Sequence, residues 1–347
     1  MNQPIELRAA PYQHSGRDVA TIMRNVVYSL LPVCAFAVWQ YGVSAAALLL
    51  SVTASCLLTE RLLNKLSAQP GTLGDWSAAI TGLLLALTLP PAFPLWMAFV
   101  AGFAAIALGK ALFGGLGYNV FNPALVGRAF VQAAFPVAIT TWVPAFSMQR
   151  FSEFIPSTFT APLMIPPGLA AWIRQQGVDA FTGATPLARW KFENAATSAH
   201  DLLSGAVTAS TGETSAILIL VCGIYLAARK FMDWRIPVAV LASAALTAWL
   251  FQLYDPAHFP APLFVLLSGG LMLGAVFMAT DVSTSPVTPL GVWIYGALIG
   301  VVTVMIRYFG GLTEGVMYAI LMGNALSPFI DQYTQPRVFG THKKSRK

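Results

Sequence analysis

Charged residues are scarce in this sequence: Asp, Glu, Lys and Arg together make up 10% of its 347 residues, against about 25% in an ordinary soluble domain. Hydrophobic residues make up 56% of the chain, and this composition excludes a water-soluble fold. A membrane-spanning helix takes about 20 apolar residues, so the apolar runs have room for about ten helices. The sequence therefore predicts an all-α integral membrane protein of the cell inner membrane.

Cysteine and histidine are also scarce, and neither forms a metal-binding pattern. Cys34, Cys56 and Cys222 lie singly inside apolar runs, so no CxxC pair is present to bind zinc or an iron–sulfur cluster. All four histidines lie outside those runs, so no pair of intramembrane histidines can hold a haem. We expect no metal site, and any redox centre in this chain must be of another kind.

The surplus of basic residues follows a membrane-topology pattern, although a net charge of +6 is also typical of nucleic-acid binding. If the amino terminus is cytoplasmic, fifteen of the 20 Lys and Arg residues fall on the cytoplasmic side of the predicted helices. Basic residues in short loops mark the cytoplasmic side of a membrane protein. The distribution therefore predicts that both termini are cytoplasmic, that the chain contacts membrane lipid and that it binds no nucleic acid.

Apolar runs bounded by Gly, Pro and charged residues predict ten helices. The predicted helices lie near residues 25–42, 43–60, 77–90, 95–113, 124–142, 214–230, 236–253, 260–279, 289–306 and 312–330. The chain is thereby divided into a cytoplasmic segment (1–24), five helices (25–142), a periplasmic loop (143–213), five further helices (214–330) and a basic cytoplasmic tail (331–347). A loop as long as 143–213 is usually functional.

The two groups of five helices resemble each other. Phe113-Gly114-Gly115-Leu116 recurs as Phe309-Gly310-Gly311-Leu312, and three more matches follow each copy at the same spacing. An odd number of helices per repeat inverts the second copy across the membrane. Inverted repeats are typical of transporters, in which interrupted helices of the two halves meet at the ion site. We predict that the third and eighth helices are interrupted in this way, but short helices with polar loops would give the same spacing.

Two acidic residues lie at these predicted breaks. Asp75 precedes the third helix and Asp281 follows the eighth. An acid at a helix break within a membrane is a candidate ion-pathway residue. Each aspartate could equally cap a helix end at the membrane interface, and the sequence leaves both interpretations open.

The periplasmic loop contains a candidate attachment site. In Thr182-Gly183-Ala184-Thr185, small residues surround Thr185, and Pro186 keeps Thr185 out of a helix. We expect its hydroxyl to be accessible on a turn and able to accept a bulky phosphoryl group. As a four-residue pattern, the segment is also typical of a plain turn.

A second motif lies at the cytoplasmic start of the fifth helix. Asn119, Phe121 and Asn122 place two amides and an aromatic ring close together. Such side chains suit a planar, hydrogen-bonding ring such as an isoalloxazine. The alternative is an Asn-Pro helix start in which Arg128 anchors the cytoplasmic side.

These motifs together resemble those of the RnfD/NqrB family. Residues 119–130 are similar to its NPALxGRAF motif and residues 182–185 to its flavinylation motif, and Leu89-Pro90-Pro91 and Ala279-Thr280-Asp281 also match. The resemblance covers nearly the whole chain and is closest to the RnfD branch, which belongs to the Rnf complex. It implies FMN attached covalently through its phosphate to Thr185 by a flavin transferase. It also implies a second, non-covalent flavin, riboflavin, which we assign to Asn119, Phe121 and Asn122.

The resemblance further implies the activity. A protein of this branch would carry electrons across the membrane in an ion-translocating ferredoxin:NAD⁺ oxidoreductase and couple them to Na⁺ or H⁺ movement. The sequence shows no cytoplasmic site for NAD⁺ or ferredoxin, so other membrane and peripheral subunits would supply those sites and this chain would be inactive alone. Two alternatives remain, a non-redox channel of the urea or ammonium type and a purely structural membrane protein.

Overall fold

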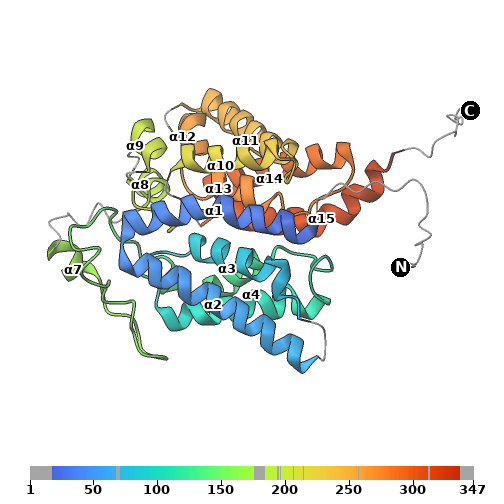
Figure 1. Cartoon of the computed structure of the whole chain (residues 1–347). Coiled ribbons are helices and arrows are strands. Elements are labelled where there is room, and N and C mark those ends of the chain that lie inside the picture. Colours follow the sequence, from blue (N-terminus) through green and yellow to red (C-terminus); the bar gives the residue numbers. More distant parts are fainter. Residues whose placement is uncertain are drawn as a thin grey trace, which may run out of the picture.

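The computed structural model of the chain describes residues 18–67, 71–175, 184–193, 195, 197–205, 207–213, 215–256, 258–311 and 313–336. Within these residues, every regular element is a helix and there is no strand (Figure 1). The prediction of an all-α protein is confirmed for this part of the chain.

The first half holds the helices expected from the apolar runs. They are α1 (Val19–Tyr41), α2 (Val43–Leu66), α3 (Ser77–Thr88), α4 (Leu95–Gly109), α5 (Pro123–Ala134) and the short α6 (Pro136–Ile139), with single 3-10 turns at Leu73–Asp75 and Ala111–Phe113. One residue, Gly42, separates α1 from α2 with a φ of 71°. A Cβ at this position would lie 1.8 Å from the Arg150 carbonyl oxygen, so only glycine permits this tight corner.

The second half also begins and ends its helices close to the predicted positions. Its helices are α10 (Ala216–Ala228), α11 (Arg235–Tyr254), α12 (Pro262–Leu267), α13 (Leu271–Leu273), a π-helix (Gly274–Met278), α14 (Pro289–Phe309) and α15 (Val316–Thr334). The predicted eighth helix is interrupted between Leu267 and Leu271, where Gly269 has a φ of 65°. The predicted third helix is a single short helix that stops at Thr88, just before Pro90 and Pro91.

The segment between the two halves contains further short helices. In its described part they are α7 (Ala170–Gln175), α8 (Pro186–Glu193) and α9 (Ala199–Ser204). The long loop expected from the sequence therefore has helical structure of its own, and α8 begins directly after the candidate residue Thr185.

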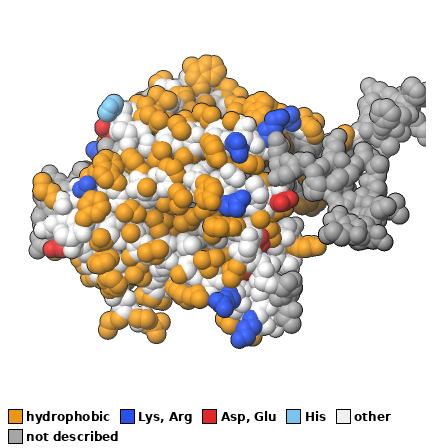
Figure 2. Space-filling model, in the orientation of Figure 1, with side chains coloured by type: hydrophobic (Ala, Val, Ile, Leu, Met, Phe, Trp, Pro, Cys, Tyr) orange, Lys and Arg blue, Asp and Glu red, His pale blue; other side chains and the backbone are white. Residues whose placement is uncertain are grey.

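Among the described residues, five helices are long and apolar enough to cross a membrane: α1, α2, residues Leu95–Phe113, α11 and α14. The shorter helices α3 and α10 are apolar as well. Hydrophobic side chains cover most of the face seen in Figure 2, and a soluble monomer rarely exposes apolar patches that large. These features support a multi-pass membrane protein.

The arrangement of the helices separates the two halves. α2, α3 and α4 lie on one side of α1 and α10–α14 on the other (Figure 1), and α1 packs against both α3 and α10. The beginning of α1 and the end of α15 lie at one end of the molecule, and α7, α8 and α9 lie at the other. The described ends of the helical region and the segment between the two halves therefore lie at opposite ends of the molecule.

Candidate functional site

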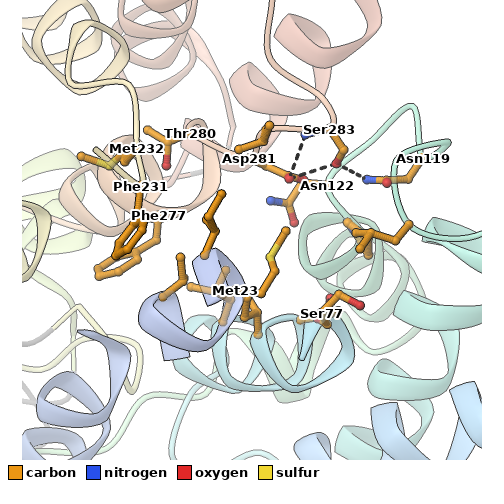
Figure 3. Close-up of a pocket in the computed structure, with 18 of the residues that line it drawn as sticks. Met23, Ser77, Asn119, Asn122, Phe231, Met232, Phe277, Thr280, Asp281 and Ser283 are labelled. Atoms are coloured by element: carbon orange, nitrogen blue, oxygen red, sulfur yellow. Dashed lines mark hydrogen bonds between the residues drawn. The ribbon is translucent and has the colours of Figure 1, made fainter. Parts of the chain in front are cut away.

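A cavity of about 80 Å³ opens where α1, α3, α5 and the segment after the π-helix meet (Figure 3). We call it the Asp281 cavity. The residues that line it include Met23, Ser77, Lys110, Asn119, Asn122, Phe231, Met232, Phe277, Asp281 and Ser283. Two of the three residues assigned to the second flavin and one ion-pathway candidate therefore line the same space.

Hydrogen bonds connect three of these residues across the two halves of the chain. The Asn119 amide Nδ2 donates to Ser283 Oγ at 2.9 Å, and Ser283 Oγ donates to Asp281 Oδ1 at 2.9 Å (Figure 3). The Ser283 backbone N–H donates to the same carboxylate oxygen at 3.3 Å. Burial raises the pKa of Asp281, and its bonds with Ser283 and Thr284 oppose that rise. The aspartate is thus partly shielded from water, which favours its protonated form.

The other ion-pathway candidate, Asp75, has a matching arrangement at the start of α3. Its Oδ1 accepts hydrogen bonds from the Ser77 backbone N–H at 2.8 Å and from Ser77 Oγ at 2.5 Å. Both aspartates therefore lie two residues before a serine that bonds back to them, and both serines line the Asp281 cavity. Each aspartate therefore accepts a hydrogen bond from the local backbone and also lies beside the cavity.

A buried lysine joins the same region. Lys110 Nζ lies 2.7 Å from Glu60 Oε1 and 3.9 Å from Asp75 Oδ2, and it donates to Ser77 Oγ at 2.5 Å. Glu60 Oε1 also accepts a hydrogen bond from the Thr72 hydroxyl, while Glu60 Oε2 has no partner among the described residues. A buried charge of this kind needs such pairing to offset the loss of hydration.

Asn122 has a structural role as well as a place in the cavity wall. Its Oδ1 accepts the Ala124 N–H at 3.0 Å, which caps α5, and its Nδ2 donates to the Met278 carbonyl at 3.2 Å. The Phe121 ring is not among the groups that line the cavity, and the aromatic lining comes from Phe231 and Phe277. Phe231 precedes α11 and Phe277 lies in the π-helix, so no local motif could have indicated them.

Two arginines are buried in the interior, away from the Asp281 cavity. Arg128 of α5 donates to the Thr88 carbonyl, the last in α3, and lies 2.6 Å from Glu314 Oε2. Arg307 of α14 is 1% exposed and donates to the carbonyls of Val265 at 2.6 Å and Ser268 at 2.9 Å. Each arginine therefore binds the carbonyl end of one short helix, where a positive charge is favourable.

A further carboxylate, Glu213, lies close to these arginines. It lines a small cavity of about 20 Å³ together with Thr88, Arg128, Gly270 and Glu314, which we call the Glu213 cavity. Burial and the negative charge of Glu314 raise the pKa of Glu213, whereas Arg128, Ser210 and Arg307 lower it, and the rise predominates. Glu213 is not among the residues predicted from the sequence, because nothing in the local sequence indicates its neighbours.

Thr185 lies directly before α8, but its side chain is less accessible than the sequence suggested. It is only 4% exposed, and Thr185 Oγ1 accepts the Ala188 N–H at 3.2 Å. The expectation of an exposed hydroxyl is therefore wrong for the described structure: the hydroxyl caps a helix inside the fold. Ala184 is described, whereas Thr182 and Gly183 lie outside the described residues.

α8 packs over the break in the eighth predicted helix. A Cβ on Gly269 would lie 2.6 Å from Leu187 Cδ1, and Lys191 Nζ donates to the Arg307 carbonyl at 3.2 Å and also to that of Gly310. Partial burial lowers the pKa of Lys191. A third small cavity, the Thr185 cavity, is lined by Thr185, Leu187, Glu213 and Gly269 among others. The candidate attachment residue therefore borders the interrupted helix.

Comparison with known proteins gives one consistent family. The family model described as "NQR2, RnfD, RnfE family" matches residues 6–340. The chain is 37% identical to the D component of the Na(+)-translocating ferredoxin:NAD(+) oxidoreductase complex of Acetobacterium woodii, over 98% of this chain and 96% of the relative.

Two further relatives match over similar lengths. The D component of the proton-translocating ferredoxin:NAD(+) oxidoreductase complex of Clostridium ljungdahlii is 35% identical, over 97% of this chain and 96% of its own. The D component of the ion-translocating oxidoreductase complex of Escherichia coli O81 is 37% identical, over 97% of this chain and 99% of its own.

Proposed function

The chain belongs to the NQR2, RnfD, RnfE family, and on that premise we propose that it is the flavin-bearing membrane subunit of an ion-translocating ferredoxin:NAD⁺ oxidoreductase. The observation that carries the proposal is the end-to-end match with relatives named as the D components of such complexes. The chain would be one part of an enzyme, with other membrane and peripheral subunits as partners. Those subunits would supply the ferredoxin and NAD⁺ sites.

We propose Thr185 as the residue that carries covalent FMN, which supplies one- and two-electron transfer when bound. Thr185 Oγ1 stands at the amino end of α8, where it accepts the Ala188 backbone N–H. A phosphate on that oxygen would meet the positive end of the helix dipole, which suits anions. Modification would need Thr185 to become accessible to the transferase, because its side chain is covered.

We assign the non-covalent flavin, riboflavin, to the Asp281 cavity. Asn119 and Asn122, which the sequence assigned to this flavin, line the cavity, and Phe231 and Phe277 offer the aromatic faces that a flat ring needs. Phe121 contributes no side chain to the cavity lining, so the assignment now rests on the two asparagines and the two phenylalanines.

Ion movement would use the same two ends of the protein. Ten membrane crossings in two inverted repeats would place Asp75 and Asp281 on the cytoplasmic side and residues 143–213 on the periplasmic side of the inner membrane. Support comes from the positions of α1, α15 and α7–α9 at opposite ends of the molecule (Figure 1).

The test of this function is in-gel flavin fluorescence of the denatured polypeptide, produced together with a flavin transferase. Wild type should fluoresce, Thr185→Ala should lose the signal entirely, and Thr160→Ala, in the same inter-repeat segment, should keep it. A dark wild-type band from a host with an active transferase would contradict the proposal and favour the channel or the structural membrane protein.

A further inference from the structure

The segment that ends at Glu213 connects the two short helices in the interior. The Thr211 N–H donates to the Leu89 carbonyl at 3.0 Å and the Gly212 N–H to the Leu87 carbonyl at 2.7 Å, both at the carbonyl end of α3. On its other side, a Cβ on Gly270 would lie 2.7 Å from Glu213 Oε1. The Glu213 carboxylate is therefore held between the end of α3 and the break that follows α12.

Glu213 also separates two cavities. It is the one residue shared by the linings of the Thr185 cavity and the Glu213 cavity in the described part of the chain. Met278 also lines the Glu213 cavity. Its carbonyl accepts the hydrogen bond from Asn122, which lines the Asp281 cavity. The three cavities thus follow one another from the Thr185 end to the Asp281 end, with Glu213 at the first boundary.

The charges around Glu213 balance only when its carboxylate is ionised. Arg128 and Arg307 bring two positive charges, and Glu213 and Glu314 bring two negative ones. Glu213 Oε2 and Glu314 Oε1 are buried without a hydrogen-bond partner among the described residues. One proton on Glu213 would change the net charge of the group from zero to +1.

The surroundings suit a proton better than a metal cation. A metal ion needs several oxygen ligands, but the Glu213 cavity measures only about 20 Å³ and Arg128 forms part of its wall. The Thr88 carbonyl is already bonded to Arg128. Most of the other lining is apolar, from Leu125, Leu273, Met278, Val316 and Met317.

We infer that Glu213 is a proton-binding residue that lies between the covalent-flavin site and the interface of the two halves. This inference rests on the proposed function. An electron that reaches the Thr185 side, supplied by reduced ferredoxin through the partner subunits, adds one negative charge. The Glu213 carboxylate then accepts one proton from water and becomes a neutral carboxyl, so the added charge is balanced. Loss of the electron to the next carrier returns the proton.

The electrostatics favour this exchange. The ionisable groups that face Glu213 are Tyr41 of α1, Arg128 of α5, Arg307 of α14 and Glu314, which precedes α15. Burial and Glu314 raise the pKa of Glu213 more than the arginines lower it. A carboxyl with a raised pKa can change its protonation state at a pH closer to neutral than an exposed one can.

The test is infrared spectroscopy of the purified complex, which detects the C=O stretch of a protonated carboxyl. In a pH titration, wild type should gain this band as the pH falls toward neutrality. Glu213→Gln should lose that component, and the exposed control Glu153→Gln should match wild type. In difference spectra, reduced minus oxidised, recorded above the midpoint of this titration, where the oxidised protein holds the carboxylate, the same band should appear in wild type and be missing in Glu213→Gln.

Glu314→Gln gives a second measurement in case Glu213→Gln does not fold. Removal of the Glu314 charge should move the carboxyl titration to lower pH. A titrating band that is unchanged in both variants would overturn the inference. Flavin fluorescence is recorded on the same samples. A dark wild-type band with a Glu213-dependent titration would refute the proposed function and leave proton binding standing.

Discussion

Three basic side chains are buried: Lys110, Arg128 and Arg307. Each binds partners that are distant from it in the sequence. Lys110 pairs with Glu60, Arg128 with Glu314, and Arg307 with two backbone carbonyls. Charged side chains inside a membrane protein are costly and are usually retained for a function. Removing one member of a buried pair typically costs about 3–5 kcal/mol, which is close to what a small domain can lose before it unfolds. These residues therefore constrain the fold strongly around the cavities.

At the residue scale, Asp281→Asn should change both stability and function. Because burial raises the pKa of Asp281 in the folded state, the ionised form is disfavoured there, and the wild-type protein should gain stability as the pH falls from neutral toward the ordinary carboxyl value of 3.8. The variant lacks this gain. Unfolding temperatures of both proteins across that range should show a difference that grows in favour of wild type at lower pH.

The same variant tests the ion pathway. Asp281→Asn should lower ion transport by the reconstituted complex more than it lowers flavin content. The exposed Asp233→Asn serves as the control, with ion transport like wild type. Ion coupling that is unchanged in Asp281→Asn would remove Asp281 from the pathway.

At the element scale, the short helices depend on groups that do not belong to them. The carbonyl end of α3 is bonded by Arg128 from α5 and by the backbone of Thr211 and Gly212, and α12 ends on Arg307 from α14. A helix end inside a membrane leaves carbonyls that water cannot reach, and each must find a partner. The breaks are possible because other elements supply these donors.

Gly212 should therefore be sensitive to a single added methyl group. A Cβ there would lie 2.5 Å from Leu87 Cβ and 3.0 Å from the Leu87 carbonyl oxygen, so Gly212→Ala must push the segment away from α3. We expect a loss of about 1–3 kcal/mol from overpacking, seen as a lower unfolding temperature in detergent. Gly168→Ala, which has no neighbour within 4 Å, should stay close to wild type. An unfolding temperature of Gly212→Ala equal to that of wild type would contradict the close contact.

At the scale of the whole molecule, the proposed membrane orientation predicts where the basic side chains lie. Hydrophobic side chains cover the face in Figure 2, and most of the Lys and Arg groups visible there lie toward the end where α1 begins. Those groups belong at the cytoplasmic surface if basic residues mark that side.

Thiol labelling should reveal this orientation. Cys34, Cys56 and Cys222 are buried, so they should give little background. A membrane-impermeant thiol reagent added to intact spheroplasts should label Glu153→Cys, in the segment 143–213. It should label Lys65→Cys, at the end of α2, only after the membrane is opened. Labelling of Lys65→Cys in intact cells would contradict the orientation.

The sequence by itself determined the class of the protein and most of its helices. Membrane helices are encoded locally, because a run of about 20 apolar residues identifies each one, and the helices predicted near 43–60, 236–253 and 289–306 lie where expected. Proline is a local signal as well, so the end of α3 before Pro90 could be foreseen, whereas the break at Ser268–Gly270 lies inside the helix predicted over 260–279. The family resemblance also followed from contiguous motifs.

Only the tertiary structure decided which polar side chains meet. Glu213 and Glu314 are 101 positions apart in the sequence, and Phe231 and Phe277 reach the Asp281 cavity from separate elements. Thr185 was expected to be exposed, yet α8 packs it against the interrupted helix. Which charges pair, which side chains line a cavity and which are buried all depend on distances between segments that are remote in the sequence. Those distances are set by the packing of the helices, including that of α1 against α3 and α10.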